Sequence, residues 1–185
     1  MTEKHGKIYV ISAPSGAGKT SLCKELIDFF PALRHSVSYT TRLMRAGEVD
    51  GVDYHFVSQA AFDQMVSAGN FVEWAQVHGN CYGTTLEAIK QSRDSGSDIL
   101  LEIDCQGARQ LKKNLEHAVF IFIMPPSLEE LQRRLVGRKT DNQEVIKRRL
   151  FNASEEMKEA AWYDHVVIND KFEIALAKLK EILQG

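Results

Sequence analysis

Short runs of apolar residues alternate with longer amphipathic segments along the whole chain. The runs at 7–12, 98–104 and 118–123 contain few polar residues, which is typical of parallel strands that are buried on both faces. Segments 35–41 and 165–169 are predicted as two further, shorter strands. The pattern therefore predicts five strands.

Helical patterns stand between these strands. The segment from Lys19 to Phe30 and the C-terminal segment 172–183 space their apolar residues as amphipathic helices do. An order of strand, helix and strand is typical of a parallel sheet with helices on both faces. We therefore predict an α/β fold with a parallel five-stranded sheet.

Two stretches depart from this alternation of strands and helices. Residues 43–90 contain short extended segments around a helical one at 60–67, which predicts a small mixed α/β subdomain inserted into the core. Residues 126–160 are helical and rich in arginine. We predict a single domain whose core comprises about 1–42, 91–125 and 161–185. The helical stretch carries two apolar stripes, formed by Leu128, Leu131 and Leu135 and by Ile146, Leu150, Ala153 and Met157.

Composition and charge narrow the functional classes. The chain has 185 residues, and its formal net charge of -2 gives no general footprint for nucleic acid or an anionic membrane. Its apolar runs are far shorter than the roughly 20 residues of a membrane helix, and the N-terminus lacks a secretory pattern. Three widely spaced cysteines fit buried, reduced thiols. We expect a cytoplasmic protein without nucleic-acid or membrane partners.

A near-complete phosphate-binding loop follows the first strand. The pattern G-x-x-x-x-G-K-[ST] is met by Gly18, Lys19 and Thr20, whereas Ala13 replaces the first glycine. Alanine is acceptable there because Pro14 favours an extended residue before it. Lys19 is predicted to bind the β- and γ-phosphates, and Thr20 to bind Mg²⁺. The predicted ATP-binding residues of the loop are Ala13, Pro14, Ser15, Gly16, Ala17, Gly18, Lys19, Thr20 and Ser21.

The sequence beyond the loop distinguishes among nucleotide-binding families. No base-reading N-K-x-D of GTPases is present, and segments 36–57, 71–84 and 100–108 resemble the guanylate kinases of the bacterial type. The resemblance covers residues 6–183. It implies a P-loop NTPase core, an inserted GMP-binding subdomain at about 43–90 and a lid at about 126–160. It also implies transfer of a phosphoryl group from ATP to GMP, and to dGMP, with Mg²⁺.

Two arginines are spaced to bind a phosphate group. Arg42 and Arg45 follow a predicted strand, and two guanidinium groups can hold a phosphate dianion through paired hydrogen bonds. Tyr54 and Tyr82 can add hydroxyl donors. The resemblance assigns all four to the GMP phosphate. Met44 stands where the family often has proline, but the arginine spacing is unchanged.

Glu73 lies in an otherwise apolar strand, where a carboxylate needs a polar partner. Guanine offers adjacent N1–H and N2–H donors, whereas adenine presents a lone pair at N1. We therefore predict that Glu73 selects guanine. The resemblance places the hydroxyls of Ser38 and Thr84 at the O6 side of the base, and Gly83 is assigned to the same site.

Two acidic residues follow a buried strand. Glu102 and Asp104 are two residues apart and share a face, at the edge where open α/β sheets bind ligands. Asp104 matches the family position near GMP and the metal, which it would contact through water. Glu102 is expected to contact guanine or to orient an arginine. A purely structural ion pair is the alternative for both.

The predicted lid supplies positive charge. Arg134 and Arg138 are one helical turn apart, and Arg149 lies beside the next apolar stripe. We expect these arginines to neutralise the transferred phosphoryl group as catalytic residues, together with Lys19 and Arg42. Asn169 matches a position near the ATP adenine, where its amide would bind the base or order the loop.

Two other functions stay open at this point. Guanylate-kinase-like domains also serve as interaction modules without catalysis, but these usually lack a working phosphate loop or the lid arginines. A P-loop kinase for another phosphorylated acceptor is the second alternative, and Glu73 argues against it. The sequence predicts no oligomeric state.

Overall fold

The computed structural model describes residues 6–77, 79–115, 117–137 and 142–185. The chain divides into two compact units. The first comprises Met1–Ile8, Ala32–Leu101 and Gln106–Ala118. The second comprises Tyr9–Pro31, Glu102–Cys105 and Val119–Gly185.

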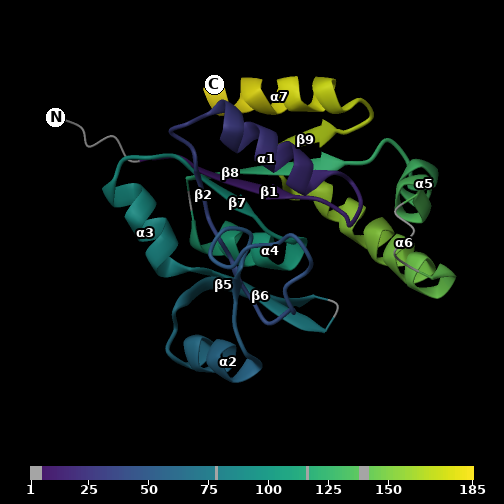
Figure 1. The fold of residues 1–185 in the computed structure, drawn as a ribbon. Helices are drawn as coiled ribbons and strands as arrows, with labels where there is room; N and C mark the ends of the chain where they lie inside the picture. The colour runs from purple at the N-terminus through teal and green to yellow at the C-terminus, as the bar shows by residue number, and fades with distance from the viewer. Residues whose placement is uncertain (1–5, 78, 116, 138–141) are drawn as a thin grey trace. The chain divides into compact units, whose positions relative to one another are not determined.

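The predicted five-stranded parallel sheet is confirmed (Figure 1). Its strand order is β2-β7-β1-β8-β9. All five residues of β1 are buried, as are Phe120 to Ile123 in β8, which explains why these strands are apolar without interruption. The strands are β1 (Ile8–Ser12), β2 (Arg34–His35), β7 (Ile99–Glu102), β8 (Ala118–Met124) and β9 (His165–Ile168).

The second sheet is mixed, as predicted for the inserted segment, and its order is β4-β3-β6-β5. Strand β3 pairs parallel with β4 and antiparallel with β6, and β5 pairs antiparallel with β6. Helix α2 (Gln59–Ser67) packs on this sheet through Phe62, whose ring stacks on Phe71 at 4.6 Å. The strands are β3 (Tyr39–Thr40), β4 (His55–Phe56), β5 (Phe71–Val77) and β6 (Asn80–Thr85).

The prediction of one strand at 35–41 is wrong. The segment forms two short strands, β2 and β3, which belong to different sheets. The amide of Ser36 still donates to the carbonyl of Leu100 in β7, whereas the carbonyl of Ser38 accepts from the amide of His55 in β4. Both halves are extended, so alternation alone could not separate them.

Helices account for most of the remaining chain. Most of the two apolar stripes predicted for the arginine-rich stretch pack on each other, since Leu131, Leu135, Ile146 and Ala153 form one cluster with Leu150 against it. Leu128, predicted in the first stripe, is instead 38% exposed. The helices are α1 (Lys19–Phe29), α3 (Leu86–Asp94), α4 (Cys105–Asn114), α5 (Leu128–Gly137), α6 (Gln143–Lys158), α7 (Phe172–Gln184) and the short 3₁₀ helix η1 (Glu159–Trp162).

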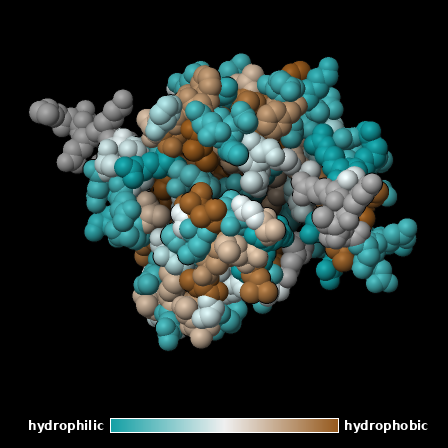
Figure 2. All heavy atoms as spheres, viewed as in Figure 1, coloured by the Kyte–Doolittle hydropathy of each residue, from teal (hydrophilic) through white to brown (hydrophobic). Residues whose placement is uncertain are grey.

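The remaining sequence expectations concern cysteines and surface. Cys23, Cys81 and Cys105 are all free and buried, as predicted. Among the described residues, no helix has the length and apolar character required to cross a membrane. On the face shown in Figure 2, apolar residues are scattered among polar ones, as on most folded proteins.

Candidate active site

The predicted phosphate loop joins β1 to α1 in the second unit. Gly16 and Gly18 have φ angles of 95° and 92°, a left-handed conformation that favours glycine. Gly18 directly precedes the first residue of α1, so the loop ends at the positive end of a helix. Such a loop presents backbone amides to an anion.

Asn169 holds this loop in place. Its side-chain amide donates to the carbonyl of Ala17 at 2.8 Å, and the residue is 5% exposed. A Cβ atom on Gly18 would lie 2.5 Å from Asn169 Nδ2. Gly18 therefore allows both the left-handed turn and the close approach of Asn169. The hydrogen bond from Asn169 orders the loop, which is one of its two predicted roles beside binding the adenine.

The charged and hydroxyl groups of the loop are held by the end of β7. Lys19 Nζ donates to the carbonyl of Ile103 at 2.9 Å. Thr20 Oγ1 donates to Glu102 Oε1, which lies 4.0 Å from Lys19 Nζ. Glu102 was expected beside guanine or an arginine. The structure places it instead beside Thr20, the predicted Mg²⁺ ligand, and Lys19, the predicted phosphate-binding residue.

Asp104 contributes to a carboxylate pair in this unit. Burial raises the pKa of Glu156 to about 7, and the negative charge of Asp104 adds to this rise. Glu156 Oε2 is buried and has no hydrogen-bond partner among the described residues. The sequence pattern gave no signal for Glu156, because its neighbour Asp104 comes from a distant part of the chain.

The three predicted lid arginines have different surroundings. Arg134 donates to Glu130 Oε1 and to the carbonyl of Asn169, both at 2.9 Å, so it supports the residue that orders the phosphate loop. Arg149 is half-buried on α6. Arg138 lies outside the residues that the structure describes.

In the first unit, strand register gathers the predicted acceptor residues on one face of the second sheet. Glu73 lies directly opposite Thr84, and Thr40 lies opposite Tyr82. Opposed residues share a face, and side chains alternate along a strand. Ser38, Tyr82, Thr84 and Glu73 therefore belong to one face, whereas Gly83 belongs to the other.

Glu73 and Thr84 are polar and almost fully buried, with exposures of 3% and 1%. The hydroxyl of Thr84 has no hydrogen-bond partner among the described residues. An extra residue in β5, between Phe71 and Glu73, forms a bulge, and bulges commonly re-aim a side chain near a functional site. The face therefore places a buried carboxylate opposite a buried hydroxyl that forms no hydrogen bond within the described part of the chain.

Arg42 lies among the predicted phosphate-binding groups. Its guanidinium carbon is 5.3 Å from the centre of the Tyr54 ring, and Tyr54 and Tyr82 are in edge contact at 5.9 Å. Arg45 has an exposed side chain, although its backbone amide donates to the neighbouring Glu48 carboxylate. Three of the four predicted phosphate-binding side chains are thus together.

Sequence reasoning missed Glu48. Its two carboxylate oxygens accept from the two terminal nitrogens of Arg42 at 3.0 and 2.7 Å, and one of them also accepts from the amide of Arg45. The hydrogen bond from Arg42 lowers the pKa of Glu48. A phosphate group offers the same paired acceptor geometry, so the Arg42–Glu48 pair shows that the guanidinium of Arg42 is oriented for a paired interaction with an anion.

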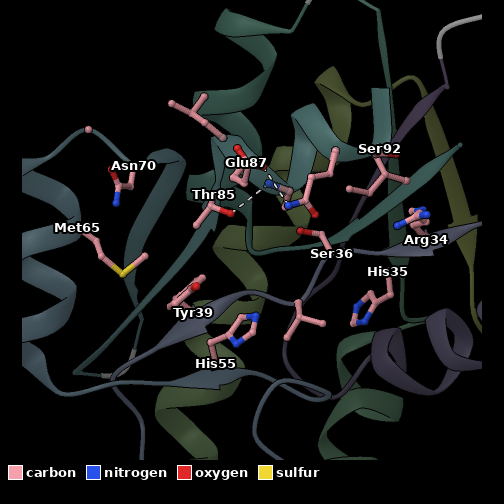
Figure 3. A pocket seen from close by; sticks show the side chains of 16 residues that line it. Arg34, His35, Ser36, Tyr39, His55, Met65, Asn70, Thr85, Glu87 and Ser92 are labelled. Atoms are coloured by element: carbon pink, nitrogen blue, oxygen red, sulfur yellow. Dashed lines mark hydrogen bonds between the residues drawn. The ribbon is translucent and has the colours of Figure 1, made fainter. Parts of the chain in front are cut away.

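A separate cavity lies in the first unit (Figure 3). Its volume is about 610 Å³, and its lining includes Tyr39, His55, Ser36 and Thr85. Tyr39 and Thr85 alternate with Thr40 and Thr84, so they belong to the other face of the second sheet. This cavity is not the surface on which the predicted acceptor residues gather.

Comparison with known proteins identifies the family. A sequence model described as "Guanylate kinase" matches residues 5–185. The chain is 58% identical to the guanylate kinase of Syntrophotalea carbinolica over 181 residues, which are 98% of this chain and 86% of that protein. It is 56% identical to the guanylate kinase of Geobacter metallireducens over 181 residues, which are 98% of this chain and 89% of that protein.

The chain belongs to the guanylate kinase family. A solved guanylate kinase from Anaplasma phagocytophilum superposes with a TM-score of 0.83 at 36% identity, covering 100% of this chain and 87% of that one. The family assignment agrees with the resemblance seen in the sequence.

We predict that Glu156→Gln stabilises the protein at alkaline pH. A carboxyl group whose pKa is raised from 4.5 to about 7 destabilises the fold increasingly between these values and fully above them. Glutamine resembles the protonated acid at every pH. Urea unfolding should give a gain of about 1–2 kcal/mol at pH 8, after allowance for solvent near the group, and almost none at pH 5.

Glu155→Gln is the matched control, because the Glu155 side chain is 53% exposed and forms an ion pair with Lys158 on the same helix. It should show no such pH dependence. An equal effect of Glu156→Gln at both pH values would contradict the predicted burial of a carboxyl group at this position.

Proposed function

We propose that this guanylate kinase family member transfers the γ-phosphoryl group of ATP to GMP, and to dGMP, giving ADP and the corresponding diphosphate. The observation that carries the acceptor assignment is the buried Glu73 carboxylate opposite the Thr84 hydroxyl, which has no hydrogen-bond partner in the described ranges of the chain. A carboxylate can accept from N1–H and N2–H of guanine, whereas a hydroxyl can donate to O6. Adenine lacks this pattern of donors and acceptors.

The acceptor phosphate is proposed to bind Arg42, with Arg45, Tyr54 and Tyr82 completing its surroundings. Arg42 already forms a paired interaction with the Glu48 carboxylate. The phosphate dianion carries more charge than a carboxylate and would replace Glu48 on the guanidinium. Ser38 is proposed to border the base with its side chain, and Gly83, which belongs to the other face, with its backbone only. The acceptor subdomain is proposed to comprise about 43–90.

The donor phosphates are proposed to lie in the loop at 13–21. The left-handed glycines Gly16 and Gly18 leave the backbone open to an anion. Lys19 would exchange the carbonyl of Ile103 for the β- and γ-phosphates. Asn169 keeps the loop ordered from its buried position, and its neighbourhood is proposed to receive the adenine.

Mg²⁺ is the metal implied by this family, and the residues present fit it. Thr20, Glu102 and Asp104 offer oxygen ligands, which Mg²⁺ prefers. No cluster of three histidine, cysteine or acidic side chains suited to a metal occurs in the described part of the chain. Thr20 would hold the metal directly and the two acids would hold it through water. The bound metal would neutralise phosphate charge.

The chain's own contribution to the reaction is positioning and positive charge. The acceptor phosphate is already an anion at neutral pH, so no general base is needed. The attacking oxygen must lie in line with the γ-phosphorus and the leaving oxygen. Arg134, Arg138 and Arg149 are proposed to add charge from a lid at about 126–160, and to exclude water. We propose the cytoplasm as the place of action.

A coupled assay with ATP and each of GMP, AMP, CMP and UMP tests the function. We expect turnover of GMP, with kcat/KM for AMP lower by roughly 10⁴-fold because a site built for paired donors rejects an analogue that lacks them. Equal turnover of AMP and GMP would refute the proposed acceptor.

Lys19→Ala should lower kcat by at least roughly 100-fold, because an ammonium group at the transferred phosphate stabilises the transition state. Lys24→Ala is the matched control, since Lys24 is an exposed residue of the same helix. Initial rates with saturating GMP provide the measurement. A Lys19→Ala enzyme within a few-fold of wild type would show that the donor site lies elsewhere.

A further inference from the structure

Helix α4 contacts strand β5, which carries Glu73, within the first unit. Gln110 of α4 accepts from the backbone amide of Trp74 at 3.3 Å and donates to the carbonyl of Trp74 at 2.7 Å. Trp74 directly follows Glu73. Strand β5 is an edge strand of the second sheet, so the Gln110 amide pairs with backbone groups as a neighbouring strand would.

The same helix approaches the carboxylate itself. A Cβ atom on Gly107 would lie 2.2 Å from Glu73 Oε2 and 3.0 Å from Glu73 Cδ. Gly107 is buried and is three residues before Gln110, so both residues lie on one face of α4. One helical face therefore contacts two consecutive residues of β5.

The contact also places the carboxylate near the first turn of α4, which begins at Cys105. The N-terminal turn of a helix favours negative charge. The bulge before Glu73 makes the local backbone of β5 irregular, so pairing with β6 alone restricts the direction of the Glu73 side chain less than in a regular strand. The contacts of α4 with Trp74 and with the carboxylate restrict this direction further.

We propose that Gln110 and Gly107 are positioning residues that set the Glu73 carboxylate for guanine and so determine acceptor specificity. This inference rests on the proposed function. Gln110 acts through the backbone of β5, and Gly107 acts through the space that its missing side chain leaves for Glu73 Oε2. Neither residue is proposed to touch the acceptor.

Gly107→Ala provides the sharper test. Alanine favours a helix over glycine, and the atom that its methyl group meets is the end of a side chain, so the fold has a way to accommodate it. The carboxylate must move instead. We expect the variant to remain folded while it loses acceptor discrimination.

The readout is the ratio of kcat/KM for GMP to that for inosine monophosphate, which lacks the N2 amino group. This ratio does not depend on the fraction of enzyme that is folded, so a purely structural loss would leave it unchanged. In Gly107→Ala and in Gln110→Met the ratio should fall roughly tenfold, as expected for loss of a hydrogen bond to a charged group. The KM for ATP should stay within about twofold of wild type, because the donor site is untouched.

Gln64→Met is the matched control, because Gln64 is an exposed residue of α2. It should keep the wild-type ratio. A wild-type ratio in both Gly107→Ala and Gln110→Met would overturn the inference while the proposed function stands. Wild-type enzyme that failed to phosphorylate GMP in the same assay would overturn both.

Discussion

Burial of the Glu73 carboxylate is the constraint on which the second sheet depends. A charged group removed from water costs several kcal/mol unless polar groups replace the lost solvent. Glu73 retains 3% exposure and lies opposite Thr84, at a bulge, and against the first turn of α4. In the proposed function, a guanine base adds the donors that a carboxylate in this position can accept. The proposal therefore makes the cost of burial and the selection of the acceptor two aspects of one arrangement.

In the second unit the proposed ligand, rather than the protein group, is the anion. A loop that is proposed to hold a polyphosphate benefits from binding groups that are ordered before the anion arrives. Asn169 fixes the carbonyl of Ala17, and Arg134 in turn donates to the carbonyl of Asn169. Lys19 donates to the carbonyl of Ile103, and Thr20 donates to Glu102. In the proposed function, substrate binding would exchange these hydrogen bonds for others, which reduces the cost of desolvation.

Much of this was readable from the sequence because it depends on local patterns. Continuous apolar runs predicted the buried parallel strands, and the spacing of Gly18, Lys19 and Thr20 predicted the loop. The alternation of side chains placed Glu73 in an apolar strand as an exception that needed a partner. The family resemblance added the acceptor residues, of which Arg42, Tyr54 and Tyr82 are found together.

The rest depends on contacts between distant segments. Segment 35–41 divides between two sheets because β7 and β4 provide separate hydrogen-bond partners, which no local pattern reports. The contact of Glu102 with Thr20 and that of Gln110 with Trp74 join residues 82 and 36 positions apart. Glu48 was missed because the sequence does not show which carboxylate pairs with Arg42 in the absence of the proposed phosphate.

The most direct test of guanine selection is calorimetric binding of GMP and inosine monophosphate to wild type and to Glu73→Gln. We expect wild type to bind GMP roughly tenfold or more tightly than the inosine nucleotide, because the extra N2–H group donates to a charged acceptor. Glu73→Gln should lose most of this preference. The same preference in both proteins would contradict the account, since the amino group would then be recognised by a group other than Glu73.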